Sequence, residues 1–321
     1  MASTLYLLSL LLAQASSQSI QDFGVSGGDG PTGGIGDAAH PVLQAQAFIT
    51  DGMVPTAPNT TRQLARGDPP VLVRNGTGCS TRRSIVVDST PKGARQEMLG
   101  FGHAWTDSAT DVFDSLEPEL QDQVMRDLFG QEGNNMGFMR HTIGSSDLSP
   151  VAYSYDDNGP SFNEGEPDYG LLNFSLGPYG TRMAEWIARM GKYKGDVTLI
   201  GATWSYPGWM KNNGLFIAPN TGGAHVLGNN SFNPRYMPQA IEYFTKYVDA
   251  FKAHGVNING MSLQNEPLNY QGGTTTMYLD AVDAATMINE GLGEAMQQRD
   301  VKILAYDHNT GMDAKHSTPF L

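Results

Sequence analysis

The sequence contains little cysteine and little positive charge. Cys79 is the only cysteine among 321 residues, so no disulfide can form within the chain. Lysine and arginine number 20 against 33 aspartate and glutamate residues, which gives a formal net charge of −13. Nucleic acids and anionic membrane surfaces are bound through basic patches, so this acidity argues against both as partners. We expect a neutral partner and a monomeric protein.

Long hydrophobic runs are also missing, and the one short run lies near the N-terminus. Residues 1–18 contain a mostly apolar stretch from Leu5 to Leu12 followed by small residues, a pattern typical of a signal peptide. The stretch is too short to span a bilayer, and no later stretch is long enough. We therefore expect a secreted, extracellular protein. Four N-x-Ser/Thr sequons agree with this location, and they begin at Asn59, Asn75, Asn173 and Asn229.

The overall balance, 40% hydrophobic and 17% charged residues, is that of a globular protein. Residues 19–80 are rich in glycine and proline and follow no helical or strand period, so we expect a loosely packed segment without catalytic groups. Residues 81–95 contain one predicted strand, SIVVDST, and a turn at Pro91-Lys92-Gly93. A second strand, QEMLGFG, is predicted over residues 96–102.

Strands and helices alternate through residues 96–321. Predicted helices cover residues 107–129, 180–191, 238–254 and 276–298, and the strands around them read GFGHAWT, MGFMRHTIG, VTLIGATW, INGMSLQNEP and VKILAYDHN. Apolar strands that alternate with helices predict an α/β fold with a parallel sheet, either doubly wound or closed as a (β/α)8 TIM barrel. No G-x-G-x-x-G follows the first strand, which argues against a doubly wound nucleotide-binding fold.

Polar and aromatic residues gather where each predicted strand ends, and this favours the barrel. In a barrel the carboxyl ends of the strands line the active site. The clusters are His103, Trp105 and Asp107; Arg140, His141 and Asp147; Trp204, Tyr206 and Trp209; Asn265 and Glu266; and Asp307, His308 and Asn309. None of them contains H-E-x-x-H or a similar metal-binding spacing, so we expect no metal and no cofactor.

The stretch SLQNEPLNY suggests the chemistry. Glu266 follows Asn265 at a strand end, and Pro267 restricts the turn, so a carboxyl group would be held at the barrel mouth. Aromatic walls desolvate such a group, and desolvation raises the pKa of a carboxyl group toward the range of a general acid. Flat apolar faces that suit sugar rings come from Trp105, Trp204, Trp209, Tyr153, Tyr155 and Tyr270. The combination points to a glycosidase, although each tryptophan taken alone is more often a core residue.

Five motifs in order carry a family resemblance. GFGHAWTDSA, RHTIGSSDLS with YSYDD, WSYPGWMKNNG, SLQNEPLN and AYDHNT resemble the strand-end motifs of glycoside hydrolase family 30, and most closely those of its fungal secreted endo-β-1,6-glucanases. The resemblance runs from about Ser84 to Thr310 and leaves out residues 19–80. It implies a (β/α)8 barrel with a side β-sandwich and hydrolysis of a β-linked polysaccharide with retention.

The resemblance also implies a role for each matched residue. Glu266 would be the acid/base, and Asn265 would contact the sugar 2-hydroxyl beside the reacting carbon. Asp147 and Trp204 would hold the outer hydroxyls of the sugar in the −1 subsite. Arg140 would order the carboxylates of the site, although a plain buried ion pair is an equally good interpretation. The remaining candidates for the pocket lining are Trp105, Tyr270 and His308.

One catalytic group has no match in this sequence. The family's nucleophile is a second Glu at the end of the seventh barrel strand, whereas the pattern here comprises about five βα units and one strand of the side sandwich. We therefore expect a chain that is truncated relative to the family and is inactive by itself. Endo-β-1,6-galactanase, xylanase and glucosylceramidase activities remain alternatives within the family. A shortened protein that binds glycan without hydrolysing it is the alternative from another class.

Overall fold

The computed structural model describes residues 90–159, 165–220 and 230–309, together with the backbone of four short strands between residues 35 and 66. Contacts divide the chain into two compact units, residues 1–97 and residues 98–321, which we treat separately. The predicted signal peptide, residues 84–89 of the predicted strand SIVVDST, and residues 310–321 lie outside the described residues.

The first unit contains two antiparallel strand pairs. β1 (Ile35–Gly36) pairs with β2 (Pro41–Val42), and β3 (Phe48–Asp51) pairs with β4 (Arg62–Arg66). The sequence pattern predicts no regular element in residues 19–80. Each strand has only two to five residues, which is too short for a period-2 pattern to stand out. The predicted turn at Pro91-Lys92-Gly93 is confirmed, because the Gly93 amide donates to the Thr90 carbonyl oxygen at 2.9 Å.

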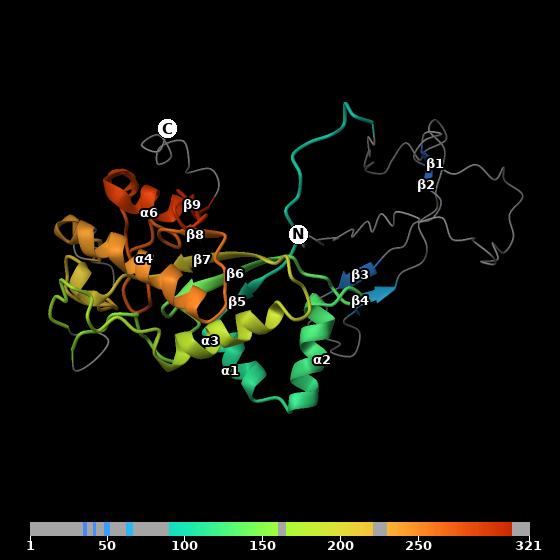
Figure 1. Ribbon diagram of the computed structural model, residues 1–321, viewed down its shortest axis with the longest axis horizontal. Coiled ribbons are helices and arrows are strands. Elements are labelled where there is room, and N and C mark those ends of the chain that lie inside the picture. The colour runs from blue at the N-terminus through green and yellow to red at the C-terminus, as the bar shows by residue number, and fades with distance from the viewer. Residues whose placement is uncertain are drawn as a thin grey trace, which may run out of the picture. The chain divides into compact units, whose positions relative to one another are not determined.

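The second unit is built on one parallel sheet of five strands. In chain order they are β5 (Ala104–Trp105), β6 (Phe138–Ile143), β7 (Thr198–Thr203), β8 (Gly260–Ser262) and β9 (Lys302–Leu304). Each strand pairs only with its neighbours in chain order, and one register row runs through Ala104, Arg140, Ile200, Gly260 and Lys302. Figure 1 shows this succession across the unit. A doubly wound sheet would reverse its strand order, so this arrangement is that of a (β/α)8 barrel.

The helices between the strands match the predicted alternation with corrected bounds. They are α1 (Asp107–Asp114), α2 (Pro118–Phe129), α3 (Gly177–Met190), α4 (Met237–Ala253), α5 (Ala281–Met287) and α6 (Gly293–Gln297), with 3₁₀ turns η1 (Gly208–Met210) and η2 (Pro234–Tyr236) and a π turn η3 (Ile288–Leu292). Among the described residues, every helix is too short or too polar to cross a bilayer.

Three predicted elements were wrong in detail. The single helix over residues 107–129 is two helices, because Pro118 cannot continue a helix and instead begins α2. The helix over 276–298 begins only at Ala281, where Asp280 caps it, and it is interrupted at Gly291 with φ of 146°. No strand forms over residues 96–102, the stretch QEMLGFG; Met98, Leu99 and Phe101 there are exposed.

The core of the second unit lies between the sheet and its helices. Aromatic residues of α4 form part of this core, since Phe244, Tyr247 and Phe251 are fully buried. Tyr247 also approaches the sheet: its hydroxyl lies 2.7 Å from His141 Nε2, and a Cβ atom on Gly201 would come within 2.1 Å of that hydroxyl. Burial lowers the pKa of His141 to about 3, so this imidazole is neutral at ordinary pH.

The loop that follows β6 contains a buried carboxyl group, that of Asp156. Its side chain is fully inaccessible, and Trp209 Nε1 donates to both its Oδ2, at 3.2 Å, and its backbone oxygen, at 3.1 Å. Burial raises the pKa of Asp156 to about 7, and repulsion from Asp168 adds to the shift. Because the folded state binds this proton more tightly than the unfolded state, ionisation of Asp156 opposes folding.

We predict that Asp156→Asn removes part of the pH dependence of stability. The folded pKa of about 7 exceeds the unfolded value of 3.8, so wild-type stability should fall as the pH rises from about 4 to about 7. At pH 8 the variant should be more stable than wild type, by on the order of 1 kcal/mol for each tenfold difference in proton affinity between the folded and unfolded states. At pH 4 the two proteins should have similar stability. Urea unfolding at both pH values measures this. Asp127→Asn, at an exposed position, is the control; an Asp156→Asn effect of equal size at both pH values would contradict the prediction.

Candidate active site

Side chains from four neighbouring strands meet at the carboxyl end of the sheet. Trp204 directly follows β7, Asn265 and Glu266 follow β8 by three and four residues, and Asp307 follows β9 by three. Arg140 reaches them from within β6. We call these five residues the strand-end cluster. The parallel register brings them together, because the carboxyl ends of parallel strands share one edge.

The guanidinium of Arg140 joins the members of the cluster. Its Nη2 donates to Asn265 Oδ1 and to Asp307 Oδ2, both at 2.8 Å. Its Cζ lies 4.7 Å from the centre of the Trp204 ring, a cation–π arrangement. Both side chains of the Arg140–Asp307 ion pair are a little over one quarter exposed. Water therefore screens part of the attraction, and the chief effect of the pair is to orient its partners.

The turn at Glu266 is held by its neighbours in an uncommon conformation. Glu266 has φ of 47°, in the left-handed region that non-glycine residues rarely adopt. Its amide donates to the Asp307 carbonyl oxygen at 2.9 Å, and its own carbonyl oxygen accepts from the Asn269 amide at 2.7 Å. Asn269 Nδ2 also donates to Glu266 Oε2 at 2.9 Å. Such a conformation costs on the order of 1 kcal/mol and persists only where surrounding contacts impose it, as they do here.

Gln264 connects the segments that follow β7 and β8. Its Nε2 donates to the Trp204 carbonyl oxygen at 2.7 Å and to the Asn265 carbonyl oxygen at 3.0 Å. The Asn265 amide adds a hydrogen bond to the Thr203 carbonyl oxygen at 2.7 Å. The sequence patterns did not single out Gln264 or Asn269. The available signal was their position, since both are polar residues that flank Glu266 within QNEPLN.

Three further candidates lie on the loops beyond the strands. Asp147 is exposed in the loop after β6 and makes no hydrogen bond within the described residues. Tyr270 is half-buried beyond the Glu266 turn, with its carbonyl oxygen accepting from Asn230 Nδ2 at 3.1 Å. His308 is half-buried, and its ring centre lies 6.0 Å from that of Tyr306.

Trp105 does not lie at the mouth, which corrects our expectation that it lines the pocket. Its side chain is fully buried, its ring stacks on Phe113 at 4.7 Å, and its Nε1 donates to Thr110 Oγ1 at 3.2 Å. Successive residues of a strand face opposite sides of the sheet, and Trp105 faces the helices. Two other aromatic residues expected to face the sugar, Tyr155 and Trp209, are also buried in the core.

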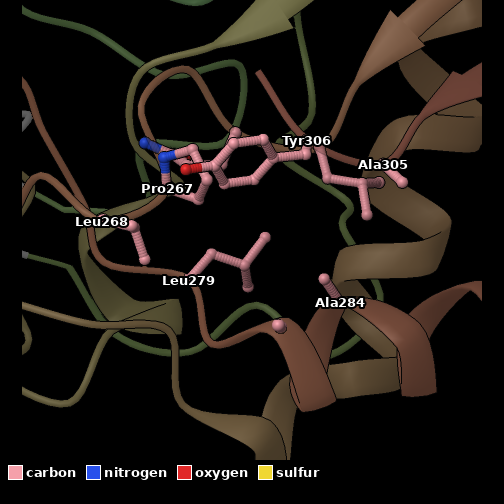
Figure 2. Close-up of a pocket in the computed structure, with 9 residues that line it drawn as sticks. Pro267, Leu268, Leu279, Ala284, Ala305 and Tyr306 are labelled. Atoms are coloured by element: carbon pink, nitrogen blue, oxygen red, sulfur yellow. The ribbon is translucent and has the colours of Figure 1, made fainter. Parts of the chain in front are cut away.

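An apolar pocket lies behind the Glu266 turn (Figure 2). Leu263, Leu279 and Ala284 line it together with Pro267, Leu268, Gln264, Ala281, Ala305 and Tyr306. No side chain of the strand-end cluster lines this pocket. A sugar needs polar partners, so the candidate active site is the cluster and not the pocket. Among the described residues, no three His, Cys, Asp or Glu side chains gather as metal ligands.

Comparison with known proteins matches this chain to one family model, to named relatives and to solved structures. The model of the family described as glycosyl hydrolase family 30 TIM-barrel domain matches residues 98–319. Endo-1,6-beta-D-glucanase of Neurospora crassa is 38% identical over 278 residues, which cover 86% of this chain and 54% of that protein. Endo-1,6-beta-D-glucanase BGN16.3 of Trichoderma harzianum is 39% identical over 243 residues, which cover 74% of this chain and 48% of that protein.

Among solved structures, the endo-beta1,6-glucanase BT3312 superposes with a TM-score of 0.63 at 25% identity, over 81% of this chain and 53% of that one. SrfJ from Salmonella typhimurium has a TM-score of 0.64 at 20% identity, over 80% of this chain and 53% of that one. That second likeness shows the fold alone. The chain thus spans about half the length of the relatives that it matches.

We predict measurable coupling between Arg140 and Asp307. A double-mutant cycle with Arg140→Gln and Asp307→Asn, followed by urea unfolding, should give a coupling free energy of about 1 kcal/mol, because the hydrogen bond is charged at both ends. The control cycle is Lys246→Gln with Glu242→Gln, a helix-surface pair separated by 3.9 Å, which should give about 0.3–0.5 kcal/mol. A coupling no larger than that of the control would show that Arg140 and Asp307 do not orient each other.

Proposed function

The chain belongs to glycoside hydrolase family 30, and we propose that the whole protein is a secreted, retaining endo-β-1,6-glucanase that hydrolyses β-1,6-glucan. The names of the relatives support the substrate, because both fungal proteins compared above are endo-1,6-beta-D-glucanases. The acidic chain agrees with an uncharged polysaccharide as partner. The leader-like residues 1–18 support secretion.

The observation that carries the proposal is the restrained position of Glu266. A general acid must hold its proton at a defined place beside the leaving oxygen. The left-handed turn, the amide bond to Asp307 and the side-chain bond from Asn269 together restrict where this carboxyl group can go. Asn265, oriented by Arg140, lies next to it and presents an amide to a sugar hydroxyl.

In the proposed reaction Glu266 first donates its proton to the glycosidic oxygen as the bond to the anomeric carbon breaks. A second, ionised carboxylate attacks that carbon and forms a glycosyl-enzyme intermediate. Glu266 then removes a proton from water, which displaces the carboxylate and restores the original configuration. The motifs of this chain contain no counterpart of the second carboxylate. We assign it to the portion of family members that this chain does not span.

The surrounding residues would bind the sugar. Trp204 and Asp147 would hold the outer hydroxyls in the −1 subsite, and Arg140 would keep Trp204 and Asn265 in place through the contacts described above. Tyr270 and His308 would line the approach. Trp105, being buried, contributes to the core beneath β5 and not to the sugar contact.

We predict that Glu266→Gln in the whole protein lowers hydrolysis of β-1,6-glucan by roughly 10²–10⁴-fold, because the leaving sugar must be protonated. The rate of glycosyl-enzyme formation from an aryl glycoside with a good leaving group should fall far less, because that leaving group needs no protonation. Glu185→Gln, at an exposed position of α3, is the control and should behave as wild type. Equal losses on both substrates, or none on the glucan, would remove Glu266 from the acid/base role.

A second experiment separates hydrolysis from binding alone. The 321-residue chain is incubated with β-1,6-glucan, and released reducing ends and saturable binding are measured in parallel. We expect binding without product, since the chain offers one catalytic carboxyl group and not two. Product formed by the chain and abolished by Glu266→Gln would show that it supplies its own nucleophile.

A further inference from the structure

The carboxyl group of Asp107, the first residue of α1, is buried beside the loop that follows β6. Only 1% of Asp107 is exposed. Its Oδ1 accepts from the backbone amide of Ser108 at 2.9 Å and from the hydroxyl of Ser149 at 2.8 Å, 42 residues away. Ser108 makes a second connection to the same loop, because its hydroxyl donates to the Leu148 carbonyl oxygen. Two adjacent residues of α1 therefore hold the loop from one side.

The loop also has hydrogen bonds of its own, and at its start the Ser145 amide donates to the Tyr153 carbonyl oxygen at 2.9 Å. The Ser146 amide donates to Ser149 Oγ at 2.7 Å, and the Leu148 amide donates to Ser146 Oγ at 3.2 Å. Ser149 Oγ thus connects the loop to Asp107 and is also an acceptor within the loop. Asp147 lies in the middle of this arrangement and is itself exposed. Its position therefore depends on hydrogen bonds made by its neighbours.

Capping of α1 does not account for Asp107. The N-cap of α1 is Thr106, whose Oγ1 accepts from the Ala109 amide at 3.1 Å. An acidic residue in the first turn of a helix gains from the helix dipole without being buried. Asp107 is instead buried, and this burial raises its pKa although hydrogen bonds from Ser149, Ser108 and Tyr153 act in the other direction. A carboxyl group kept at such a cost indicates a further use.

We propose that Asp107 is a positioning residue of the sugar site, which holds the loop over residues 145–149 through Ser149 and thereby places Asp147 against the substrate. The proposal rests on the function proposed above, in which Asp147 holds hydroxyls of the −1 sugar. It adds a group from α1 to a site otherwise made from strand ends and the loops that follow them. Asp107 itself touches no sugar.

The first test needs no ligand and measures amide hydrogen exchange of the full chain. Asp107→Ala should speed exchange at the Ser146 and Leu148 amides about tenfold, because the hydroxyl of Ser149 loses its anchor. Asp107→Asn should restore slow exchange, since its amide oxygen can still accept from Ser149. Asp111 lies on the same helix as Asp107 and forms a partly buried ion pair with Arg182 of α3. Asp111→Ala is the matched control and should leave exchange at both amides unchanged.

Ser149→Ala removes the other half of the contact and also the acceptor of the Ser146 amide. The informative amide is therefore that of Leu148, which should exchange about as fast as in Asp107→Ala. This variant keeps the proposal testable if Asp107→Ala does not fold. Exchange at the Leu148 amide that stays at the wild-type rate in Ser149→Ala would overturn the proposal. Faster exchange of the whole chain, with no excess in the loop, would also overturn it.

The second test measures affinity for a β-1,6-linked gluco-oligosaccharide by calorimetry. Asp107→Ala should weaken binding about tenfold when Asp147 is present and should have no further effect in Asp147→Ala. Equal losses in both backgrounds would show a general effect on the fold and would overturn the proposal. If Asp147→Ala binds the oligosaccharide as tightly as wild type, the sugar contact proposed for Asp147 fails, and the exchange rates alone decide whether Asp107 holds the loop.

Discussion

One hydrogen-bond donor, Arg140 Nη2, joins three strands at the point where the candidate site forms. It bonds Asn265 after β8 and Asp307 after β9, while the same guanidinium lies over Trp204 after β7. Hydrogen bonds of the sheet align the strands but leave the residues beyond their ends free to diverge. A planar, permanently charged group that can contact several partners at once removes that freedom. The geometry of the strand-end cluster depends on this contact more than on any other.

Support for the site comes from polar side chains that bond to neighbouring segments of the protein. Gln264 ties together the backbone after β7 and β8, and Asn269 holds the Glu266 carboxyl group from the following turn. On the other side, Asp107 holds the loop that carries Asp147. Each support is a polar side chain bonded to a neighbouring segment, which is how a precise arrangement is maintained on loops. The left-handed conformation of Glu266 is tolerated within this framework.

The loop after β6 also contains two carboxyl groups that are shielded from water, those of Asp156 and Asp157. Asp156 and Asp157 both have raised pKa values, about 7 and about 6, with burial as the main cause. Asp157 is nevertheless anchored, since its Oδ2 accepts from the Ser154 amide at 2.8 Å. Stability of this region is therefore greatest in mildly acidic conditions, where these groups are protonated. That dependence is separate from the chemistry proposed for Glu266.

Much of this protein could be predicted from the sequence, because local pattern determines it. The alternation of apolar strands with helices and the buried face of α4 around Phe244 require only periodicity and turn chemistry. The order of the five motifs, with Asn265 and Glu266 in the fourth, was interpretable through the family resemblance. Tertiary structure alone decided which way side chains point. Trp105 was expected at the mouth but faces the helices. The link that Gln264 makes between the segments after β7 and β8 exists only because these strands are neighbours in the sheet. Asp107 and Ser149 meet across 42 residues of chain for the same reason. Contacts between distant segments depend on strand register and side-chain direction, and a single sequence records neither of them directly.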